Sequence, residues 1–490
     1  MTLKELEKRL TKELESIDVP KDLLKGLKKE ENSYDRAGIL MSITEYLADK
    51  ANILTEDRAR TIDPPLLYFN GKVYQYLDFN LFRKCIRIYL FSKGMTPKDW
   101  IRFINRIMQS AKEATMLKKF QSHPRYIAFQ NCVVDFETFT PYKFTPDIHI
   151  TYQLDYDFDM NADCPIFKTF LKQVLPDSQS RRVIQQFFGL SFLDRYNNEH
   201  KVEKALILVG EGSNGKSVIF ETLMNTLGAR NISNMDLASL AKGGDEGMRN
   251  MAMLEHKRFN YCSEEQIGKV IQRSDVFKTL VSGEPIYARR IGQNSFRITN
   301  LPFLVFNMNK LPKFNDDTHG LFRRLLIVGF TVIIPDELQD KQLAHKIREE
   351  RSGILRWLYE GYLDLKANDF MFDISAEMRR VALNVVKETS SLVGWEKDRK
   401  FRPRKTYGYI NDDSQYINAT DLYDDYKRFC KDNDVSPTTQ AMFGRELIGR
   451  GYKKERTMNG ICYTVYGGKD EQLELDPELI KQREKLINPI

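Results

Sequence analysis

An eight-residue stretch near the middle of the chain constrains the fold more strongly than any other feature. Residues 210–217 read Gly-Glu-Gly-Ser-Asn-Gly-Lys-Ser and match the phosphate-loop pattern G-x-x-x-x-G-K-[ST] at every position. Glycines allow such a loop to curl until successive backbone N–H groups point at phosphate oxygens. The apolar residues 205–209 before it predict a strand buried in a parallel sheet, and residues 218–223 predict a helix whose amino end favours anions. The chain is therefore expected to have an α/β fold that binds a nucleoside triphosphate.

The residues of this loop have separate expected roles. Lys216 is expected to reach the β- and γ-phosphates, and the hydroxyl of Ser217 to bind Mg²⁺. The predicted nucleotide-binding residues are Gly210, Glu211, Gly212, Ser213, Asn214, Gly215, Lys216, Ser217 and Val218. Kinases, GTPases, motors and transporters all contain such loops, so the loop alone does not define the reaction.

Composition narrows the class of protein further. The 490 residues are 42% hydrophobic, which is enough for about three packed domains. The 75 basic and 68 acidic residues leave a net charge of only +7, so any site for a polyanion must be local. The six cysteines include no Cys-x-x-Cys pair, which indicates reduced thiols. No signal sequence and no apolar run of about 18 residues is found, so we expect a cytoplasmic protein that does not bind membranes.

Changes in residue pattern along the chain predict six segments. The first is charged and leucine-spaced, and the second has short aromatic and β-branched runs. The segments are residues 1–64 (helical), 65–196 (mixed α/β), 197–370 (the phosphate-loop domain), 371–390 (a helical linker), 391–468 (a C-terminal domain) and 469–490 (a charged tail).

Two glutamates follow a strand-like run downstream of the phosphate loop. Glu264 and Glu265 come directly after residues 258–263. Mg²⁺ needs oxygen ligands and an attacking water needs a base, so we assign Glu264 to the metal, together with Ser217, and Glu265 to the water. The alternative is a pair of solvated glutamates at the start of a helix.

Two further sites adjoin apolar runs. Asn309 follows residues 301–306, and an amide at a strand tip could contact the γ-phosphate or its water. Arg323 and Arg324 come just before the apolar residues 325–328. An arginine at a subunit edge can supply charge to the nucleotide of a neighbouring subunit, although a surface ion pair is the simpler alternative.

Residues 283–298 form two alternating runs around a glycine-containing turn, which predicts a β-hairpin. Arg289 and Arg290 lie near its tip. Such a hairpin in the bore of a ring could grip a phosphate backbone.

The C-terminal domain has its own signature. An amphipathic helix over residues 421–430 precedes a second helical run at 442–447, and Asn459-Gly460 predicts a tight hairpin. Helix, helix and hairpin is the order of a winged-helix DNA-binding module. The residues expected to contact DNA are Arg445, Arg450, Lys453, Lys454 and Arg456. A protein-interaction module with a solvated basic face is the alternative.

In this order the motifs resemble the superfamily 3 helicases, which are AAA+ ATPases, and most closely the branch of phage, plasmid and poxvirus-type primase–helicases. Residues 126–138 read Tyr-Ile-Ala-Phe-Gln-Asn-Cys-Val-Val-Asp-Phe-Glu-Thr, which is similar to the N-G-V-L-D-L-E-T segment before the helicase in that branch. The resemblance covers about residues 65–468. It implies an AAA+ P-loop ATPase domain between an N-terminal helical and mixed α/β region and a C-terminal winged helix.

The resemblance also implies roles for individual residues. Lys216 would be the phosphate lysine, Glu264 and Glu265 the Walker B acids, and Asn309 the sensor. Either Arg323 or Arg324 would be the arginine finger. Residues 263–266 read Ser-Glu-Glu-Gln where the family has S-E-T-x-E, which leaves open which glutamate is the base. The expected DNA contacts around the hairpin are Lys278, Arg289 and Arg290.

The function implied is an ATP- and Mg²⁺-dependent replicative DNA helicase, and an initiator of replication, of a phage, plasmid or other mobile element. The resemblance implies a homo-oligomeric ring, a hexamer, with single-stranded DNA in its channel and duplex or origin DNA at the winged helix. A separate primase or polymerase is an expected partner, because the first 60 residues lack the paired aspartates of a primase and no primase activity is expected. The main alternative is an origin-binding or helicase-loading regulatory ATPase that does not unwind DNA. A small-molecule kinase is disfavoured because it needs neither hairpin nor winged helix.

Overall fold

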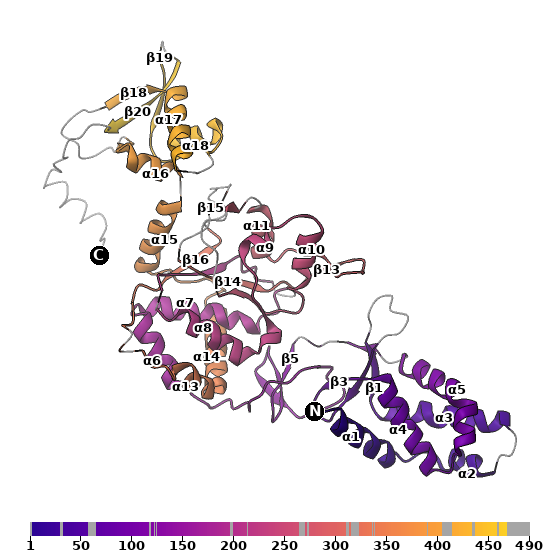
Figure 1. Ribbon diagram of the computed structural model, residues 1–490. Helices are drawn as coiled ribbons and strands as arrows, with labels where there is room; N and C mark the ends of the chain where they lie inside the picture. The colour runs from indigo at the N-terminus through magenta and orange to yellow at the C-terminus, as the bar shows by residue number, and fades with distance from the viewer. Residues whose placement is uncertain are drawn as a thin grey trace. The chain divides into compact units, whose positions relative to one another are not determined.

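The computed structural model shows a mixed α/β protein with two compact units (Figure 1). Unit 1 comprises Met1–Cys164, Phe192–Asp194 and Glu350–Tyr359, and unit 2 comprises Pro165–Ser191, Arg195–Glu349 and Glu360–Ile490. The structure describes residues 2–29, 33–56, 65–116, 119–121, 123, 125–196, 199–212, 214–263, 270–271, 274–309, 313–314, 323–335, 337, 339–389, 391–403, 414–433, 437–457 and 460–467. Each unit combines segments that are distant in sequence, and the division into six segments stays a prediction.

Helices dominate the first part of unit 1. They are α1 (Leu3–Ser16), α2 (Lys21–Lys29), α3 (Ser33–Lys50), α4 (Phe79–Ser92) and α5 (Pro97–Met116). In α1 the leucines at 6, 10 and 14 are fully buried, which is the spacing of one helix face. The start of α1 is fixed by a capping box in which Thr2 and Glu5 exchange hydrogen bonds of 2.7 and 3.3 Å. Within the predicted helical segment 1–64, α1, α2 and α3 are helices, and residues 53–56 form strand β1.

Two small sheets complete unit 1. The first has the order β3-β2-β1-β4, with β1 at Ile53–Glu56, β2 at Leu66–Phe69, β3 at Tyr74–Leu77 and β4 at Lys119–Phe120. The second is the antiparallel series β5 (Tyr126–Ala128), β6 (Val133–Asp135) and β7 (Thr140–Tyr142). Strands β5 and β6 lie within the run at 126–138 on which part of the family resemblance rests, and β7 follows it.

A five-stranded parallel sheet forms the centre of unit 2. Its order is β16-β8-β14-β10-β9, and every neighbouring pair is parallel. The strands are β8 (Ala205–Val209), β9 (Ile232–Ser233), β10 (Phe259–Cys262), β14 (Phe303–Met308) and β16 (Leu325–Gly329). The apolar runs that predicted strands at 205–209, 301–306 and 325–328 therefore lie side by side. Because all five strands run the same way, their carboxyl ends share one edge, where ligands bind in open α/β sheets.

Unit 2 also contains helices, and one of them, α14, begins in unit 1 and ends in unit 2. They are α6 (Pro165–Val174), α7 (Ser178–Gly189), α8 (Lys216–Leu227), α9 (Leu237–Leu240), α10 (Gly244–Ala252), α11 (Ser274–Ser282), α13 (Leu343–Glu349), α14 (Arg351–Ala367) and α15 (Ala376–Thr389). Two phenylalanines of α7 pack on the sheet: Phe187 lies 6.3 Å from the Phe259 ring and Phe188 lies 6.1 Å from the Tyr261 ring. The two short strands β11 (Val270–Ile271) and β15 (Lys313–Phe314) pair with each other.

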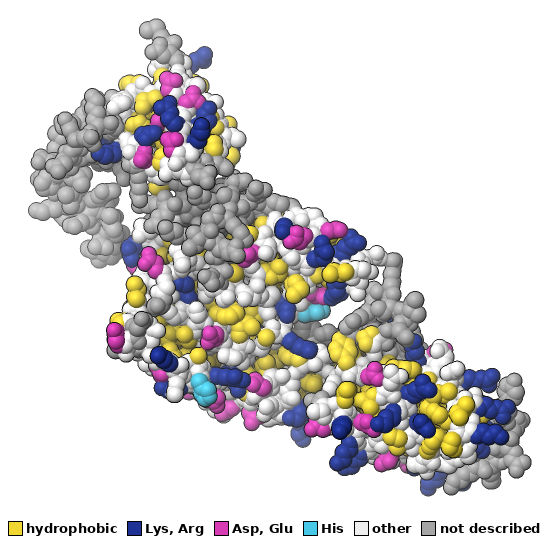
Figure 2. Space-filling view, in the orientation of Figure 1, with side chains coloured by type: hydrophobic (Ala, Val, Ile, Leu, Met, Phe, Trp, Pro, Cys, Tyr) yellow, Lys and Arg dark blue, Asp and Glu magenta, His cyan; other side chains and the backbone are white. Residues whose placement is uncertain are grey.

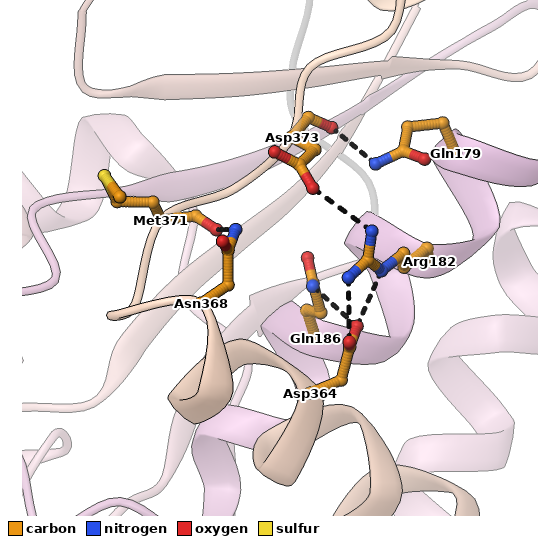
Figure 3. Close-up of polar contacts among 7 residues, drawn as sticks. All are labelled: Gln179, Arg182, Gln186, Asp364, Asn368, Met371 and Asp373. Atoms are coloured by element: carbon orange, nitrogen blue, oxygen red, sulfur yellow. Dashed lines mark hydrogen bonds and ion pairs between the residues drawn. The ribbon is translucent and has the colours of Figure 1, made fainter.

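A polar network holds α7 to the end of α14 (Figure 3). Arg182 donates to both carboxylate oxygens of Asp364 at 2.7 and 2.8 Å, and Gln186 donates to the same carboxylate at 2.7 Å. Arg182 also donates to the Asp373 carboxylate at 3.1 Å, and Gln179 to its backbone carbonyl at 3.1 Å. The segment between α14 and α15 is thereby attached to the helix that supports the sheet.

A β-hairpin and a C-terminal module complete unit 2. The hairpin is β12 (Ile286–Arg289) with β13 (Ser295–Ile298), as predicted. The C-terminal module consists of α16 (Ser391–Asp398), β17 (Phe401–Arg402), β18 (Ser414–Asn418), α17 (Ala419–Asp432), α18 (Gln440–Gly449), β19 (Lys453–Thr457) and β20 (Gly460–Gly467). The predicted order of helix, helix and hairpin is thus present as α17, α18 and β19–β20. Trp395, Tyr426 and Phe443 fill the core of the module.

None of the described helices has the length and apolar character needed to cross a membrane.

Candidate functional site

The phosphate-loop sequence lies between β8 and α8, at the carboxyl edge of the parallel sheet. Gly210 donates its N–H to the Met308 carbonyl at 3.1 Å, and Phe330 donates to the Val209 carbonyl at 2.7 Å. A Cβ at position 210 would lie 2.4 Å from the Phe330 carbonyl oxygen. The start of the loop therefore passes so close to the chain after β16 that a side chain would collide with it.

Gly215 sets the amino end of α8. Its φ of 87° lies in the left-handed region, and a Cβ there would meet the Phe170 ring at 2.8 Å. No side chain caps the helix at this position. Among the described residues, no side chain accepts from the first N–H groups of α8, and together with the helix dipole these groups favour an anion.

Lys216 is the first residue of α8 and is only 8% exposed. Its ammonium donates to the Gly210 carbonyl, to the Glu211 carbonyl at 3.3 Å and to the Asn214 side-chain oxygen at 3.1 Å. Burial lowers the pKa of Lys216. A phosphate oxygen is a stronger, charge-assisted acceptor than a carbonyl, so this ammonium is placed to exchange its partners for an anion.

Asn214 connects the loop to a neighbouring strand. It is 3% exposed, and its amide donates to the Glu211 carbonyl and to the Phe330 carbonyl at 3.2 Å. Because the same side chain accepts from Lys216, Asn214 joins Lys216 to the chain that leaves β16.

The loop opens on a cavity of about 1350 Å³. Of the predicted nucleotide-binding residues, it is lined by Gly212, Asn214, Gly215, Lys216, Ser217 and Val218, and Asn309 also lines it. The structure thus brings Asn309 together with Lys216 and Ser217. Ser217 is exposed to this cavity. The predicted residues Ser213, Glu264 and Glu265 lie outside the described residues.

Sequence reasoning missed a buried asparagine beside Asn309. Asn307 lies within β14, is 3% exposed and lines the cavity. It accepts a hydrogen bond from the Tyr261 hydroxyl at 3.0 Å and donates to the Ser263 carbonyl at 3.2 Å. The ends of β10 and β14 are therefore tied together beside the loop. An amide in an otherwise apolar strand was the available signal, because a buried polar group requires partners.

Two walls of the cavity are formed by segments that the sequence motifs did not predict to lie there. One is α6, which contributes Phe170 and Gln173, and the other is the segment before α13, which contributes Asp340 and Lys341. The Asp340 carboxylate is bound by Lys346 at 2.6 Å, and this hydrogen bond chiefly holds the pKa of Asp340 below its usual value. This acid is thus already paired with a cation of the adjoining helix α13.

The paired arginines before β16 have different environments. Arg324 forms an ion pair with Glu203 at 3.2 Å, donates to the Ser282 hydroxyl at 3.2 Å and is 13% exposed. Arg323 is exposed, and Lys204 donates to its backbone carbonyl at 2.5 Å. Both lie at the amino end of β16, one strand length, about 17 Å, from the edge that carries the phosphate loop. Neither lines the cavity.

The predicted hairpin cations contact acidic side chains. Arg289 lies 3.3 Å from the Asp245 carboxylate, and Arg290 pairs with Glu255 and stacks over the Phe296 ring at 4.5 Å. Around α10 and β13, Lys and Arg side chains lie beside Asp and Glu side chains (Figure 2). Lys278 lies on α11 and is half-buried.

The predicted DNA contacts of the C-terminal module fall into two groups. Arg450 ends α18 and pairs with the largely buried Glu396 at 3.1 Å, and Lys453 pairs with Glu455. The exposed cations of the set are Arg445 on α18 and Lys454 and Arg456 on β19. Burial raises the pKa of Glu396, and Arg450 opposes that rise. Arg450 thus has a structural partner that sequence reasoning did not reveal.

The fold and this site define a mixed α/β protein with a phosphate-loop sequence at the carboxyl edge of a parallel sheet. Residues 91–176 match a family model described as "D5 N terminal like", and residues 208–324 match one described as "Family of unknown function (DUF5906)".

Similar proteins come from viruses. The chain is 25% identical over 244 residues to "Putative helicase 184R" of Invertebrate iridescent virus 6, covering 47% of this chain and 25% of that protein. It is 28% identical over 228 residues to "Putative helicase L207/L206" of Acanthamoeba polyphaga mimivirus, covering 45% and 23%. The chain thus aligns with about a quarter of the length of these relatives. Among solved structures, the apo C-terminal region of NrS-1 is 14% identical with a TM-score of 0.47, covering 88% of this chain and 98% of that one.

Proposed function

We propose that this chain is an ATP-hydrolysing motor of the superfamily 3 (AAA+) type that separates DNA strands during replication of a virus or another mobile element. The observation that carries the proposal is the buried ammonium of Lys216 at the uncapped amino end of α8, inside a cavity at the carboxyl edge of a parallel sheet. The likeness to viral proteins named as helicases supports the choice of a DNA motor over other phosphate-loop enzymes.

ATP and Mg²⁺ fit the residues of the cavity. The α8 amino end and Lys216 would hold the phosphates, and the Ser217 hydroxyl would hold Mg²⁺ together with Glu264. Bound Mg²⁺ supplies charge neutralisation at the β- and γ-oxygens. Asn309 would orient the attacking water, and Glu265, or Glu264 in its place, would accept its proton.

The positions of Arg323 and Arg324 support action between subunits. Because both lie at the sheet edge opposite the phosphate loop, they cannot reach a nucleotide in their own cavity. In a ring, the proposed hexamer, that edge would supply an arginine to the next subunit. Arg323 is favoured, since Arg324 is held by Glu203.

We also propose DNA sites on the hairpin and on the C-terminal module, which would act as a winged helix. Exposed Arg445, Lys454 and Arg456 are available to duplex phosphates, and the hairpin would hold a single strand. A helicase-loading ATPase without unwinding activity is the second candidate, and the same contacts suit it.

A strand-displacement assay with tailed duplexes tests the proposal. The wild-type chain should separate strands only with ATP and Mg²⁺, and Lys216→Ala should abolish both hydrolysis and separation. Lys201→Ala, which removes an exposed lysine of the same unit, is the matched control and should retain both. Hydrolysis without separation would favour the loading ATPase, and retained hydrolysis in Lys216→Ala would overturn the site.

A further inference from the structure

The β12–β13 hairpin has one packed face and one exposed face. Ala288 is fully buried and Ile298 is 4% exposed, and both belong to the core of unit 2. Their neighbours along the strands point the other way, as alternation in a strand requires. On that side Tyr287 is 67% exposed, and Arg297 is exposed as well.

Tyr287 and Arg297 are directly opposite each other in the antiparallel register. Residues opposite in such a pair have Cβ atoms about 5 Å apart and lie on the same face of the sheet. Within the part of the chain that the structure describes, neither side chain has a hydrogen-bond or ion-pair partner. A planar aromatic ring and a planar cation therefore stand side by side, both turned to solvent.

Unlike Tyr287 and Arg297, the two arginines nearest the tip of the hairpin each have an acidic partner. Arg289 is bound by Asp245 and also donates to the Gln293 carbonyl at 3.2 Å, and Arg290 is bound by Glu255. A phosphate that approached either arginine would have to compete with a carboxylate. The Tyr287–Arg297 pair has no such competitor among the described residues, and Ile291 at the tip adds apolar surface that is 84% exposed.

We propose that Tyr287 and Arg297 form a base-stacking site for single-stranded DNA. The Tyr287 ring would stack on one base, and the Arg297 guanidinium would neutralise the adjoining phosphate. Such a site tolerates any sequence, because every base offers a flat face. The proposal rests on the proposed function and adds stacking on bases to the contacts with phosphates.

Fluorescence anisotropy with two labelled oligonucleotides of equal length, oligo-dT and a fully abasic strand, tests this site. With Mg²⁺ and a non-hydrolysable ATP analogue, the wild-type chain should bind oligo-dT ~5- to 150-fold more tightly than the abasic strand. Tyr287→Leu should remove most of this preference, and Tyr287→Phe should keep it. Arg297→Ala should reduce the salt dependence of binding, with a change in log–log slope of ~0.7 for one lost phosphate contact.

Tyr196→Leu is the matched control, because Tyr196 is a 54% exposed tyrosine of the same unit, and it should keep the preference. Thermal melting of each variant should match the wild type, since the substituted side chains are exposed. Equal wild-type affinity for both strands, or a preference that survives in Tyr287→Leu, would overturn the stacking site and leave the motor intact. Failure of the wild type to bind either strand would overturn the proposed function as well.

Discussion

At the scale of single residues, the loop of 210–217 is held in shape by contacts that extend beyond it. Lys216 donates to the Glu211 carbonyl and to the Asn214 side-chain oxygen, and the Asn214 amide in turn donates to the Phe330 carbonyl. Gly215 is confined by both its φ and the Phe170 ring. The loop therefore depends on α6 and β16 as well as on its own glycines.

Gly215→Ala should destabilise the fold and weaken nucleotide binding. A left-handed φ costs a non-glycine residue about 1–2 kcal/mol, and forcing a Cβ against Phe170 adds a similar packing cost, so ~2–4 kcal/mol is expected. Gly212→Ala is the control for stability, because its Cβ would meet nothing within 4 Å. Thermal unfolding and affinity for a fluorescent ATP analogue measure the two effects. Equal melting temperatures for both variants would contradict the packing argument.

Arg450→Ala should destabilise the C-terminal module, because it leaves the largely buried Glu396 without its cation. An acid whose pKa is raised on folding stabilises the folded state at low pH and loses that contribution as the pH rises through the folded value. Without Arg450 the pKa of Glu396 should rise further, so the variant should lose more stability at pH 7.5 than at pH 5. A loss of about 1–3 kcal/mol is expected at the higher pH, because the pair is partly exposed.

Arg445→Ala is the matched control for that variant, since Arg445 is exposed on α18. It should leave the urea midpoint unchanged at both pH values and lower only the affinity for duplex DNA. A pH-independent loss in Arg450→Ala would show that its ion pair with Glu396 is not the cause.

At the scale of elements, α7 links the sheet to the segment between α14 and α15. Its phenylalanines pack on β10 and β14, and Arg182 on its outer side binds Asp364 and Asp373 (Figure 3). The hydrogen bonds from Arg182 chiefly hold the pKa of Asp364 below its usual value. The network therefore contributes stability that depends on the charge of Asp364.

Asp364→Asn should cost at most about 1 kcal/mol near neutral pH, because the pair is more than a third exposed. A carboxylate with a lowered pKa stabilises the fold above its unfolded value, near 4, and loses this contribution as the pH falls through the lower folded value. The difference between variant and wild type should hold from pH 7 to pH 5 and shrink below about pH 4. Urea denaturation across this range measures it, with Asp369→Asn, outside the network, as the control. If the stability difference between Asp364→Asn and the wild type grew as the pH fell, the lowered pKa of Asp364 would not be its source.

At the scale of the whole molecule, the proposed ring would complete each site with an arginine from a second copy. Lys216→Ala and Arg323→Ala chains should each lack DNA-stimulated ATPase activity when alone. An equal mixture should recover activity at about a quarter of its interfaces, where an intact Lys216 meets an intact Arg323. Steady-state ATPase assays of the mixture measure this recovery. A mixture no more active than either variant would argue against action between subunits.

Arg324→Ala separates this role from folding. Because Arg324 binds Glu203 and Ser282, its loss should lower the melting temperature, whereas Arg323→Ala should not. If Arg323→Ala lowered the melting temperature and Arg324→Ala did not, Arg323 would be the structural arginine and Arg324 the candidate finger.

The sequence by itself determined the strand, loop and helix around Lys216, the hairpin and the helical order of the C-terminal module. Those features depend on local requirements: glycines where the backbone turns tightly, apolar runs where strands are buried and alternation where one face is exposed. Even Asn309 could be placed near the loop, because the carboxyl ends of parallel strands share an edge.

The tertiary structure alone decided which predicted residues have partners. Asn307 contacts Ser263, Arg324 pairs with Glu203, and Arg450 pairs with Glu396. The cavity is also walled by α6 and by the segment before α13. Each of these contacts joins residues that are far apart in the chain. Charge pairing and burial depend on which side chains meet in space, and the local pattern of residues in the sequence does not specify those contacts. For the same reason, the exposed pair Tyr287–Arg297 became visible only once the neighbours of Arg289 and Arg290 were known.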